Sequence, residues 1–194
     1  MLDGPPLARP RSEDRKKAIL AATVEIIAEQ GLGAPTLEIA KRAGVPHGSV
    51  FTYFDTKTDL FNALYRELKT ELVATVMASM PVRGRVRVQL QHLWVSWTHW
   101  GVTHPAKRRA LAHLGVSDQV TDASRRAAYE AAEFPMALIR RASGKGALRN
   151  APLQFVGALF EVAATTTMDF MTRNSARADE LCKSGFEAVW RALT

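Results

Sequence analysis

The stretch that decides the fold runs from residue 36 to residue 60 and reads TLEIAKRAGVPHGSVFTYFDTKTDL. Its pattern predicts two short helices joined by a tight turn, followed at once by the start of a third helix. Thr36 is a favourable N-cap for the first helix, and Gly44 can adopt the left-handed conformation that ends it. The second helix is expected from Pro46 to Phe54. This arrangement is typical of a helix-turn-helix, whose second helix enters the major groove of DNA.

Two features inside and after this stretch support the same interpretation. Ala40 lets the two helices approach closely, and Val50 packs back onto the first helix. Thr56 and Asp59 then form the spacing of a capping box, which predicts that a long helix begins here. Leu60, Leu64, Leu68 and Leu72 continue on one face of that helix.

The remainder of the chain predicts helices almost throughout. The first helix is expected to start at a Ser12 cap and to end at a loop that contains Gly31, Gly33 and Pro35. Pro81 and Gly84 interrupt the pattern, and beyond them helices are expected at about 85–101, 106–115, 119–142, 151–174 and 177–193. The expected fold is therefore all-α, with about nine helices in total.

The breaks in this pattern also predict the domain organisation. Residues 1–56 form an N-terminal three-helix helix-turn-helix domain, of which residues 1–11 are expected to be flexible. Residues 57–80 form a connecting fourth helix, and residues 81–194 form a larger C-terminal helical domain.

The net charge of +7 is unevenly distributed along the 194 residues. Residues 1–60 carry eight basic and eight acidic side chains, whereas residues 81–149 carry twelve basic and four acidic ones. Residues 1–60, which contain the candidate helix-turn-helix, therefore carry no net charge. One basic cluster forms the entry to the first helix, and it is either a solvated tail or an arm that contacts DNA phosphates; its members are Arg9, Arg11, Arg15, Lys16 and Lys17.

Several classes of protein are disfavoured by what the sequence lacks. No apolar run approaches the ~18–20 residues of a membrane span, so no membrane partner is expected. A single cysteine, Cys182, fits a reducing cytoplasm. There is no Gly-x-Ser-x-Gly elbow, no phosphate-binding loop and no cluster with metal-ligand spacing, since His92 and His99 lie two turns apart. We therefore expect no enzyme, no cofactor and no metal.

Residues 36–45 and 48–54, together with Lys57 and Leu60, resemble the tetracycline-repressor (TetR) family of bacterial transcription regulators. The similarity covers about 45 residues, and the remaining 130 or so match only in helical layout and length. The resemblance implies a homodimeric, ligand-responsive repressor. The chain departs from the family pattern at Pro46, where a serine cap is frequent, and at Phe51, where a tyrosine is common.

The candidate DNA-binding residues follow from the helix-turn-helix and from this match. His47 and Thr52 should point outward, toward base edges or phosphates, although His47 could instead be a solvated surface residue. Thr36 lies at a helix N-terminus, which is a natural phosphate site as well as a cap. Phosphate contacts are expected for Ser49, Tyr53 and Lys57, and Gly48 should allow DNA to approach the backbone closely. The complete set is Thr36, His47, Gly48, Ser49, Thr52, Tyr53 and Lys57.

The C-terminal domain offers candidates for ligand binding. Trp94, Trp97 and Trp100 recur every three residues on one expected helix, which indicates either an aromatic core or a partly open aromatic cavity. The resemblance implies that this helix lines an inducer pocket, and His104 is included in that expected site. Asp169 could anchor a polar ligand group or face solvent.

The last two expected helices combine small residues with aromatic ones, which suits a four-helix interface between two chains. The candidate dimer residues are Phe160, Phe186, Val189 and Trp190, and burial within one chain is the alternative. The expected protein is a cytoplasmic repressor, released from a palindromic double-stranded DNA operator by a small apolar or aromatic effector. The alternative is a DNA-binding regulator without an effector, whose C-terminal domain serves only dimerisation or protein contacts.

Overall fold

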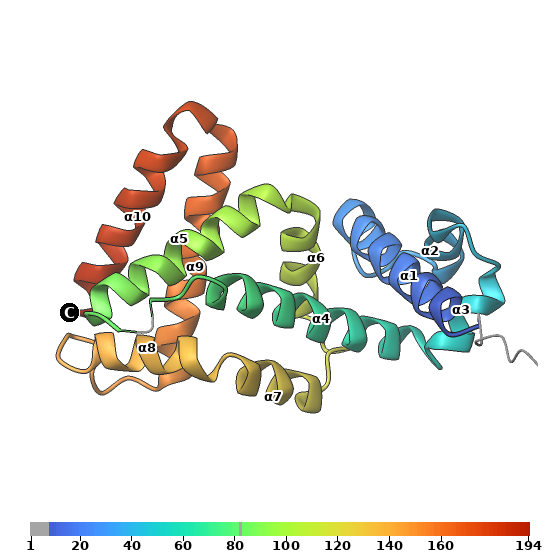
Figure 1. Ribbon diagram of the computed structural model, residues 1–194, viewed down its shortest axis with the longest axis horizontal. Helices are drawn as coiled ribbons and strands as arrows, with labels where there is room; N and C mark the ends of the chain where they lie inside the picture. Colours follow the sequence, from blue (N-terminus) through green and yellow to red (C-terminus); the bar gives the residue numbers. More distant parts are fainter. Residues whose placement is uncertain (1–7, 82) are drawn as a thin grey trace, which may run out of the picture. The chain divides into compact units, whose positions relative to one another are not determined.

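The structure, a computed structural model, describes residues 8–81 and 83–194, with side chains from Ser12 onward (Figure 1). These residues form ten α-helices, one 3₁₀ helix and no strand, which confirms the all-α prediction. The bounds are α1 Ala8–Gln30, α2 Thr36–Ala43, α3 His47–Tyr53, α4 Lys57–Met77, α5 Val86–Thr103, α6 Pro105–Gly115, α7 Asp122–Ala131, α8 Glu133–Ser143, α9 Leu153–Arg173, η1 Ser175–Arg177 and α10 Ala178–Leu193.

The described helices belong to two compact units. The first comprises the described residues up to Leu68 together with Ala106–Arg125, and the second comprises Lys69–Pro105 and Arg126–Thr194. The helix α4 contributes to both units, and the segment 106–125 is grouped with the N-terminal helices. The side chain of Asn62 on α4 holds that segment by donating to the carbonyl of Gln119 at 2.8 Å and accepting from the Thr121 amide at 2.9 Å.

The core and the caps of the first unit follow from its sequence. Leu20, Val24 and Ile27 of α1 are all buried. Gly44 adopts a left-handed conformation with φ of 66° and caps α2, a conformation that glycine adopts without steric strain. The capping box before α4 is also present, since the Asp59 amide donates to Thr56 Oγ1 at 3.0 Å and the Thr56 amide donates to Asp59 Oδ2 at 3.1 Å.

Three helix boundaries correct the predictions. The helix α1 begins at Ala8 instead of at a Ser12 cap, because Pro10 in its first turn needs no intrahelical N–H partner. Residues 8–11, which we expected to be flexible, are thus helical, whereas residues 1–7 and the side chains of Arg9 and Arg11 lie outside the described residues. The N-cap of α2 is Pro35, and Thr36 is the first helical residue.

The third correction concerns the expected helix 119–142, which forms two helices that meet at Ala132. Pro135 explains the interruption, because its ring would clash with the carbonyl of residue 131 in a continuous helix. Here Pro135 lies in the first turn of α8, where its missing N–H is not required. This division accounts for the tenth α-helix.

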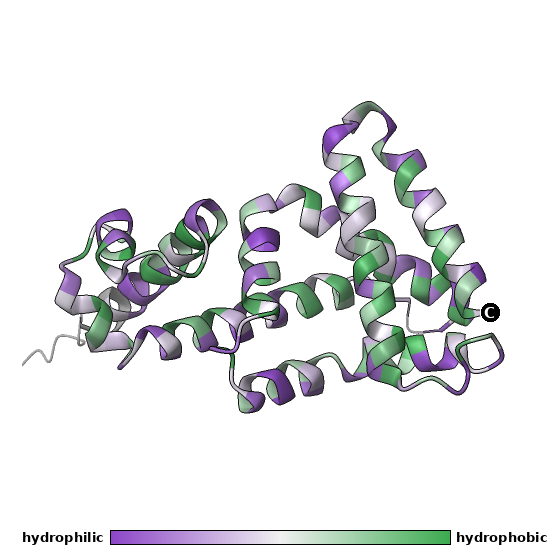
Figure 2. Ribbon diagram, turned by 180° about the vertical axis from the view of Figure 1, so that it is seen from behind, coloured by the Kyte–Doolittle hydropathy of each residue, from purple (hydrophilic) through white to green (hydrophobic). Residues whose placement is uncertain are grey.

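The second unit is built around α5, which packs against α8, α9 and α10. Hydrophobic and hydrophilic residues alternate around its helices (Figure 2), as expected for helices that each bury one face. Trp94 lies fully buried at the centre, where its indole N–H donates to the carbonyl of Cys182 at 2.9 Å and its ring meets Phe160 edge-on. None of the helices in the described part of the chain is both long and apolar enough to cross a membrane.

Candidate nucleic-acid interface

The helix α3 presents one face to the first unit and the opposite face to solvent. Val50 is 1% exposed and Phe54 is 5% exposed, so both point into the core, as predicted for Val50. His47, Gly48 and Thr52 are exposed on the other face, and Ser49 is half-buried. The polar side chains of a short helix are therefore available to a partner outside the chain.

Gly48 is not required by packing within the chain. A Cβ atom at this position would meet nothing within 4 Å among the described residues. Because glycine has no Cβ atom, the backbone of α3 is open here on the exposed face, and another molecule can approach it closely.

The start of α3 is joined to the start of α2 through two candidate DNA-binding residues. Thr36 Oγ1 and His47 Nε2 lie 3.0 Å apart and share a hydrogen bond. The His47 ring also meets the ring of Phe51, one turn later, in an edge-on contact with centroids 5.4 Å apart. Phe51 itself is 43% exposed. Pro46 precedes this helix without a side-chain cap, as expected.

Lys57, the first residue of α4, is bound within the chain. Its ammonium donates to the carbonyl of Leu32 at 2.8 Å and lies 5.3 Å from the centre of the Phe61 ring. Burial lowers the pKa of Lys57. An ammonium has three N–H donors, so the bond to Leu32 leaves donors for a phosphate.

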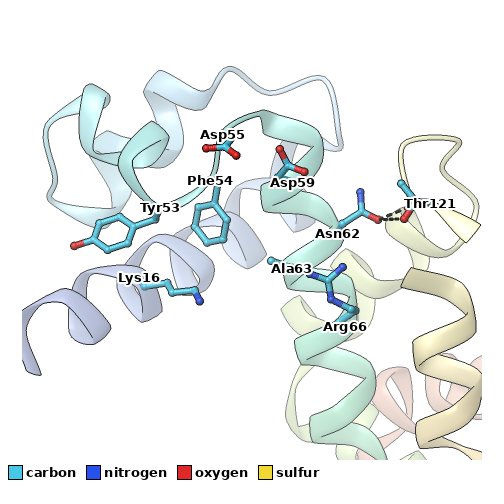
Figure 3. A pocket seen from close by; sticks show the side chains of 9 residues that line it. All are labelled: Lys16, Tyr53, Phe54, Asp55, Asp59, Asn62, Ala63, Arg66 and Thr121. Carbon is cyan, nitrogen blue, oxygen red and sulfur yellow. Dashed lines mark hydrogen bonds between the residues drawn. The ribbon is translucent and has the colours of Figure 1, made fainter. Parts of the chain in front are cut away.

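A polar pocket of about 330 Å³ lies beside the helix-turn-helix (Figure 3). Lys16 of α1 and Arg66 of α4 bring positive charge to it, and Asp55 and Asp59 bring negative charge. Figure 3 shows Tyr53 at its edge, with the hydroxyl directed away from Arg66. Sequence reasoning missed this pocket because α1, α3, α4 and the residue Thr121 meet there only in the folded chain. The complete lining is Lys16, Tyr53, Phe54, Asp55, Asp59, Asn62, Ala63, Arg66 and Thr121.

An ion-pair cluster fixes α2 against α1 near the interface. Arg42 donates to Glu25 at 2.8 Å and to both carboxylate oxygens of Glu29, at 3.1 and 2.9 Å. Hydrogen bonding to Arg42 lowers the pKa of Glu29, and the same bond raises the pKa of Arg42.

The predicted ligand-binding residues lie in the second unit, with differing degrees of burial. Trp94 is fully buried in the core, whereas Trp97 is half-buried and stacks on Phe160 with centroids 5.8 Å apart. Trp100 is 3% exposed, and its N–H donates to Glu71 Oε1 at 3.0 Å. The remaining two are His104, which stacks on Trp100, and Asp169, which is half-buried. Ligand contact by these residues stays a prediction.

Three of the four candidate dimer residues are buried inside the chain. Phe160 is 2% exposed, Phe186 1% and Val189 9%, because α9 and α10 turn these side chains toward their own unit. Trp190 is half-buried, with the Arg87 guanidinium over its ring at 5.3 Å. The side chains that these helices offer to a partner are therefore largely different ones.

An exposed apolar stripe on α9 was missed in the sequence. Phe155 is 52% exposed, Leu159 43%, Val162 64% and Phe170 47%. Their spacings of four, three and eight residues place them along one side of the helix. Steps of three and four residues mark these side chains as one face of a helix in the sequence, but they do not tell whether that face is buried.

Comparisons with known proteins agree with this geometry. The model described as "Bacterial regulatory proteins, tetR family" matches residues 19–64, which include α2, α3 and the start of α4. A transcriptional repressor of the helix-turn-helix type from Mycobacterium tuberculosis, Rv3405c, is 37% identical over 70 residues, which are 36% of this chain and 37% of that protein. The chain thus spans about two fifths of the length of the curated relatives that it matches.

Solved structures extend the likeness in fold to nearly the whole chain. A protein from Shewanella sp. PV-4, described as a tetR family transcription regulator, aligns with a TM-score of 0.82 at 24% identity, covering 92% of this chain and 97% of its own. The regulator FadR of Bacillus subtilis, solved in complex with stearoyl-CoA, aligns with a TM-score of 0.68 at 16% identity, covering 92% and 99%. At these identities the likeness concerns the fold. Residues 19–64 are thus similar in sequence to the tetR family of bacterial regulatory proteins, and the chain as a whole is similar in fold to solved structures described as tetR family regulators.

Proposed function

We propose that this protein is a transcriptional regulator that binds a palindromic double-stranded DNA operator with α3 in the major groove. The observation that carries the proposal is the division of α3 into a buried face, with Val50 and the following Phe54, and an exposed polar face. A recognition helix needs both, since one face fixes its orientation and the other contacts base edges.

Within this interface the residues divide between positioning and reading. His47 and Thr52 are the candidates for base edges, because both are exposed on α3. Phosphate contacts position the protein on DNA and carry no direct sequence information. The candidates for this second role are Thr36, Ser49, Tyr53 and Lys57, and Gly48 allows the backbone to approach.

A homodimer would supply the second recognition helix that a palindromic operator requires. The stripe of Phe155, Leu159, Val162 and Phe170 supports an interface on α9, because exposed apolar side chains along one helix face mark a surface for a partner. Trp190, on α10, remains a candidate for the same interface. An isologous interface of this kind would place the same stripe on both chains.

We further propose that a small apolar or aromatic effector binds in the second unit and releases the protein from its operator, which would make it a repressor. Trp97 supports this, because its half-buried ring offers a flat apolar surface. The structural neighbour FadR binds stearoyl-CoA, which carries a long apolar chain. The alternative is a regulator without an effector, whose second unit serves only dimerisation or protein contacts.

The test of the core proposal is selection of binding sites from a pool of random DNA duplexes by the purified full-length chain. A palindromic site is expected, with half-sites separated by one or more helical turns of ~10 bp. Recovery of unrelated sequences, with equal affinity for all of them, would overturn the proposed function.

A further inference from the structure

The side chain of His47 is held from two sides and left open on a third. Its Nε2 atom shares a hydrogen bond with Thr36 Oγ1 at 3.0 Å, and its ring packs edge-on against Phe51. Among the described residues, no hydrogen bond joins Nδ1 to the rest of the chain. His47 is exposed at the start of α3, so Nδ1 is the ring nitrogen available to an outside partner.

The bond to Thr36 constrains what Nδ1 can do chemically. In a neutral imidazole one nitrogen carries the proton and the other accepts, so a partner on Nε2 determines the role of Nδ1. If the Thr36 hydroxyl donates to Nε2, Nδ1 carries a proton and donates outward. If Nε2–H donates to the hydroxyl oxygen, Nδ1 is a bare acceptor.

Binding of DNA favours the second arrangement. Thr36 lies in the first turn of α2, where phosphate is attracted by free backbone N–H groups. A phosphate oxygen can only accept, so the Thr36 hydroxyl donates its one hydrogen bond to the phosphate. The Thr36 oxygen then has lone pairs but no proton for Nε2, and the Nε2–H tautomer is the one that completes the hydrogen bond.

We propose that Thr36 is a positioning residue that selects the His47 tautomer, so that Nδ1 accepts a hydrogen bond from an exocyclic amine in the major groove. The proposal rests on the proposed function. Only adenine N6 and cytosine N4 present such amines there, whereas guanine presents acceptors at N7 and O6 and thymine presents O4. His47 should therefore require adenine or cytosine at one position of each half-site.

The first arm of the test measures base preference. Each base pair of the selected operator is replaced in turn, and affinities are measured for the wild-type chain, Thr36→Val and Thr36→Ser. Thr36→Val should weaken binding to every sequence, because it removes a phosphate contact, and should also reduce the preference at one base pair by about tenfold. Thr36→Ser keeps the hydroxyl and should keep the preference. His47→Ala should reduce the preference at the same base pair.

The second arm observes the tautomer directly in the full-length protein with ¹⁵N-labelled histidine, using His47→Gln to assign the signal. In the operator complex, the wild type should show a protonated Nε2 and a bare Nδ1. This readout does not depend on the stability of any Thr36 variant. A protonated Nδ1 in the complex would overturn the inference, and so would an unchanged base preference in a folded Thr36→Val protein.

The two proposals fail in different ways. If the wild-type chain binds no sequence specifically, the proposed function is wrong. If it binds specifically and Thr36→Val retains the wild-type preference at every base pair, only the role given to Thr36 is wrong.

Discussion

The ammonium of Lys57 donates a 2.8 Å hydrogen bond to the main-chain carbonyl of Leu32, so the first residue of α4 holds the loop between α1 and α2. That loop leads directly into Thr36 and the start of α2. A residue that sequence reasoning selected only as a phosphate contact therefore also supports the interface from within the chain.

Both roles of Lys57 can be tested with Lys57→Met, which keeps much of the apolar stem. We expect weaker binding to all DNA sequences alike and a salt slope lower by about one. The loss of the bond to Leu32 should also lower the free energy of unfolding by about 1 kcal/mol. Lys41→Met, which changes an exposed lysine on α2, is the control for charge alone. A change in base preference with an unaltered salt slope would contradict the assignment.

Acid should weaken the attachment of α2 to α1 through Glu29. Because Arg42 lowers the pKa of Glu29 from its ordinary 4.5, the unfolded chain takes up this proton at a higher pH than the folded one. The contribution of Glu29 to stability is thus complete above pH 4.5 and is lost as the pH falls through the lowered pKa. Urea unfolding of wild type and Glu29→Gln should differ at pH 7 and converge in acid, whereas Glu13→Gln, at an exposed position of α1, should match the wild type throughout. A gap that persists at low pH argues against the ion pair as its cause.

The helix-turn-helix was predictable from sequence because its signals are local. Gly44 ends α2, and Thr56 and Asp59 cap α4, each within a few residues of its hydrogen-bond partner. The break between α7 and α8 at Ala132 has an equally local cause, because Pro135 cannot continue a helix from the preceding turn.

Other features depend on contacts between distant segments, which no local pattern encodes. Thr36 bonds to His47 across eleven residues, and Asn62 bonds to Thr121 across fifty-nine. The burial of Phe160 and Phe186 has the same origin, since a helix with apolar residues on more than one side does not reveal which side its own chain covers. The exposed side had to be seen in the folded chain.

Gly185 should be sensitive to the addition of one methyl group. A Cβ atom there would lie 2.5 Å from Thr167 Oγ1 and 2.8 Å from the ring of Trp94, which is fully buried. Gly185→Ala should therefore lower the free energy of unfolding by about 1–2 kcal/mol, after allowing for the gain in helix propensity. At Gly157 the nearest atom is the flexible end of Met136, so Gly157→Ala should be neutral or stabilising. Equal destabilisation of the two variants in thermal or urea unfolding would show that the contacts of Gly185 with Thr167 and Trp94 are not decisive.

The stripe on α9 predicts which surface joins two chains. Val162 is 64% exposed, so Val162→Lys should leave the fold intact while placing two like charges in an isologous interface. Sedimentation analysis should show a shift from dimer to monomer, with at least a tenfold weaker association. Val116→Lys changes a residue that is 86% exposed in the first unit and should leave the association unaltered. A Val162→Lys protein that remains dimeric would place the interface elsewhere.

The effector proposal predicts a shared response of fluorescence and DNA binding. An apolar or aromatic acid that acts as inducer should change tryptophan emission and release operator DNA over the same concentration range. Trp97→Ala should impair both, because the half-buried ring stacked on Phe160 is the proposed contact. If this variant responds to a confirmed inducer as the wild type does, the binding site does not include Trp97.

The reactivity of the Cys182 thiol can be used to measure local opening of the second unit. It is the single cysteine of the chain, it is 4% exposed, and its carbonyl accepts the indole N–H of Trp94. A thiol reagent can reach it only when α10 separates from α5, so the labelling rate follows the population of molecules in which that contact is broken. Because the native thiol is shielded, a cysteine introduced at an exposed position can be labelled selectively, without first removing the natural one.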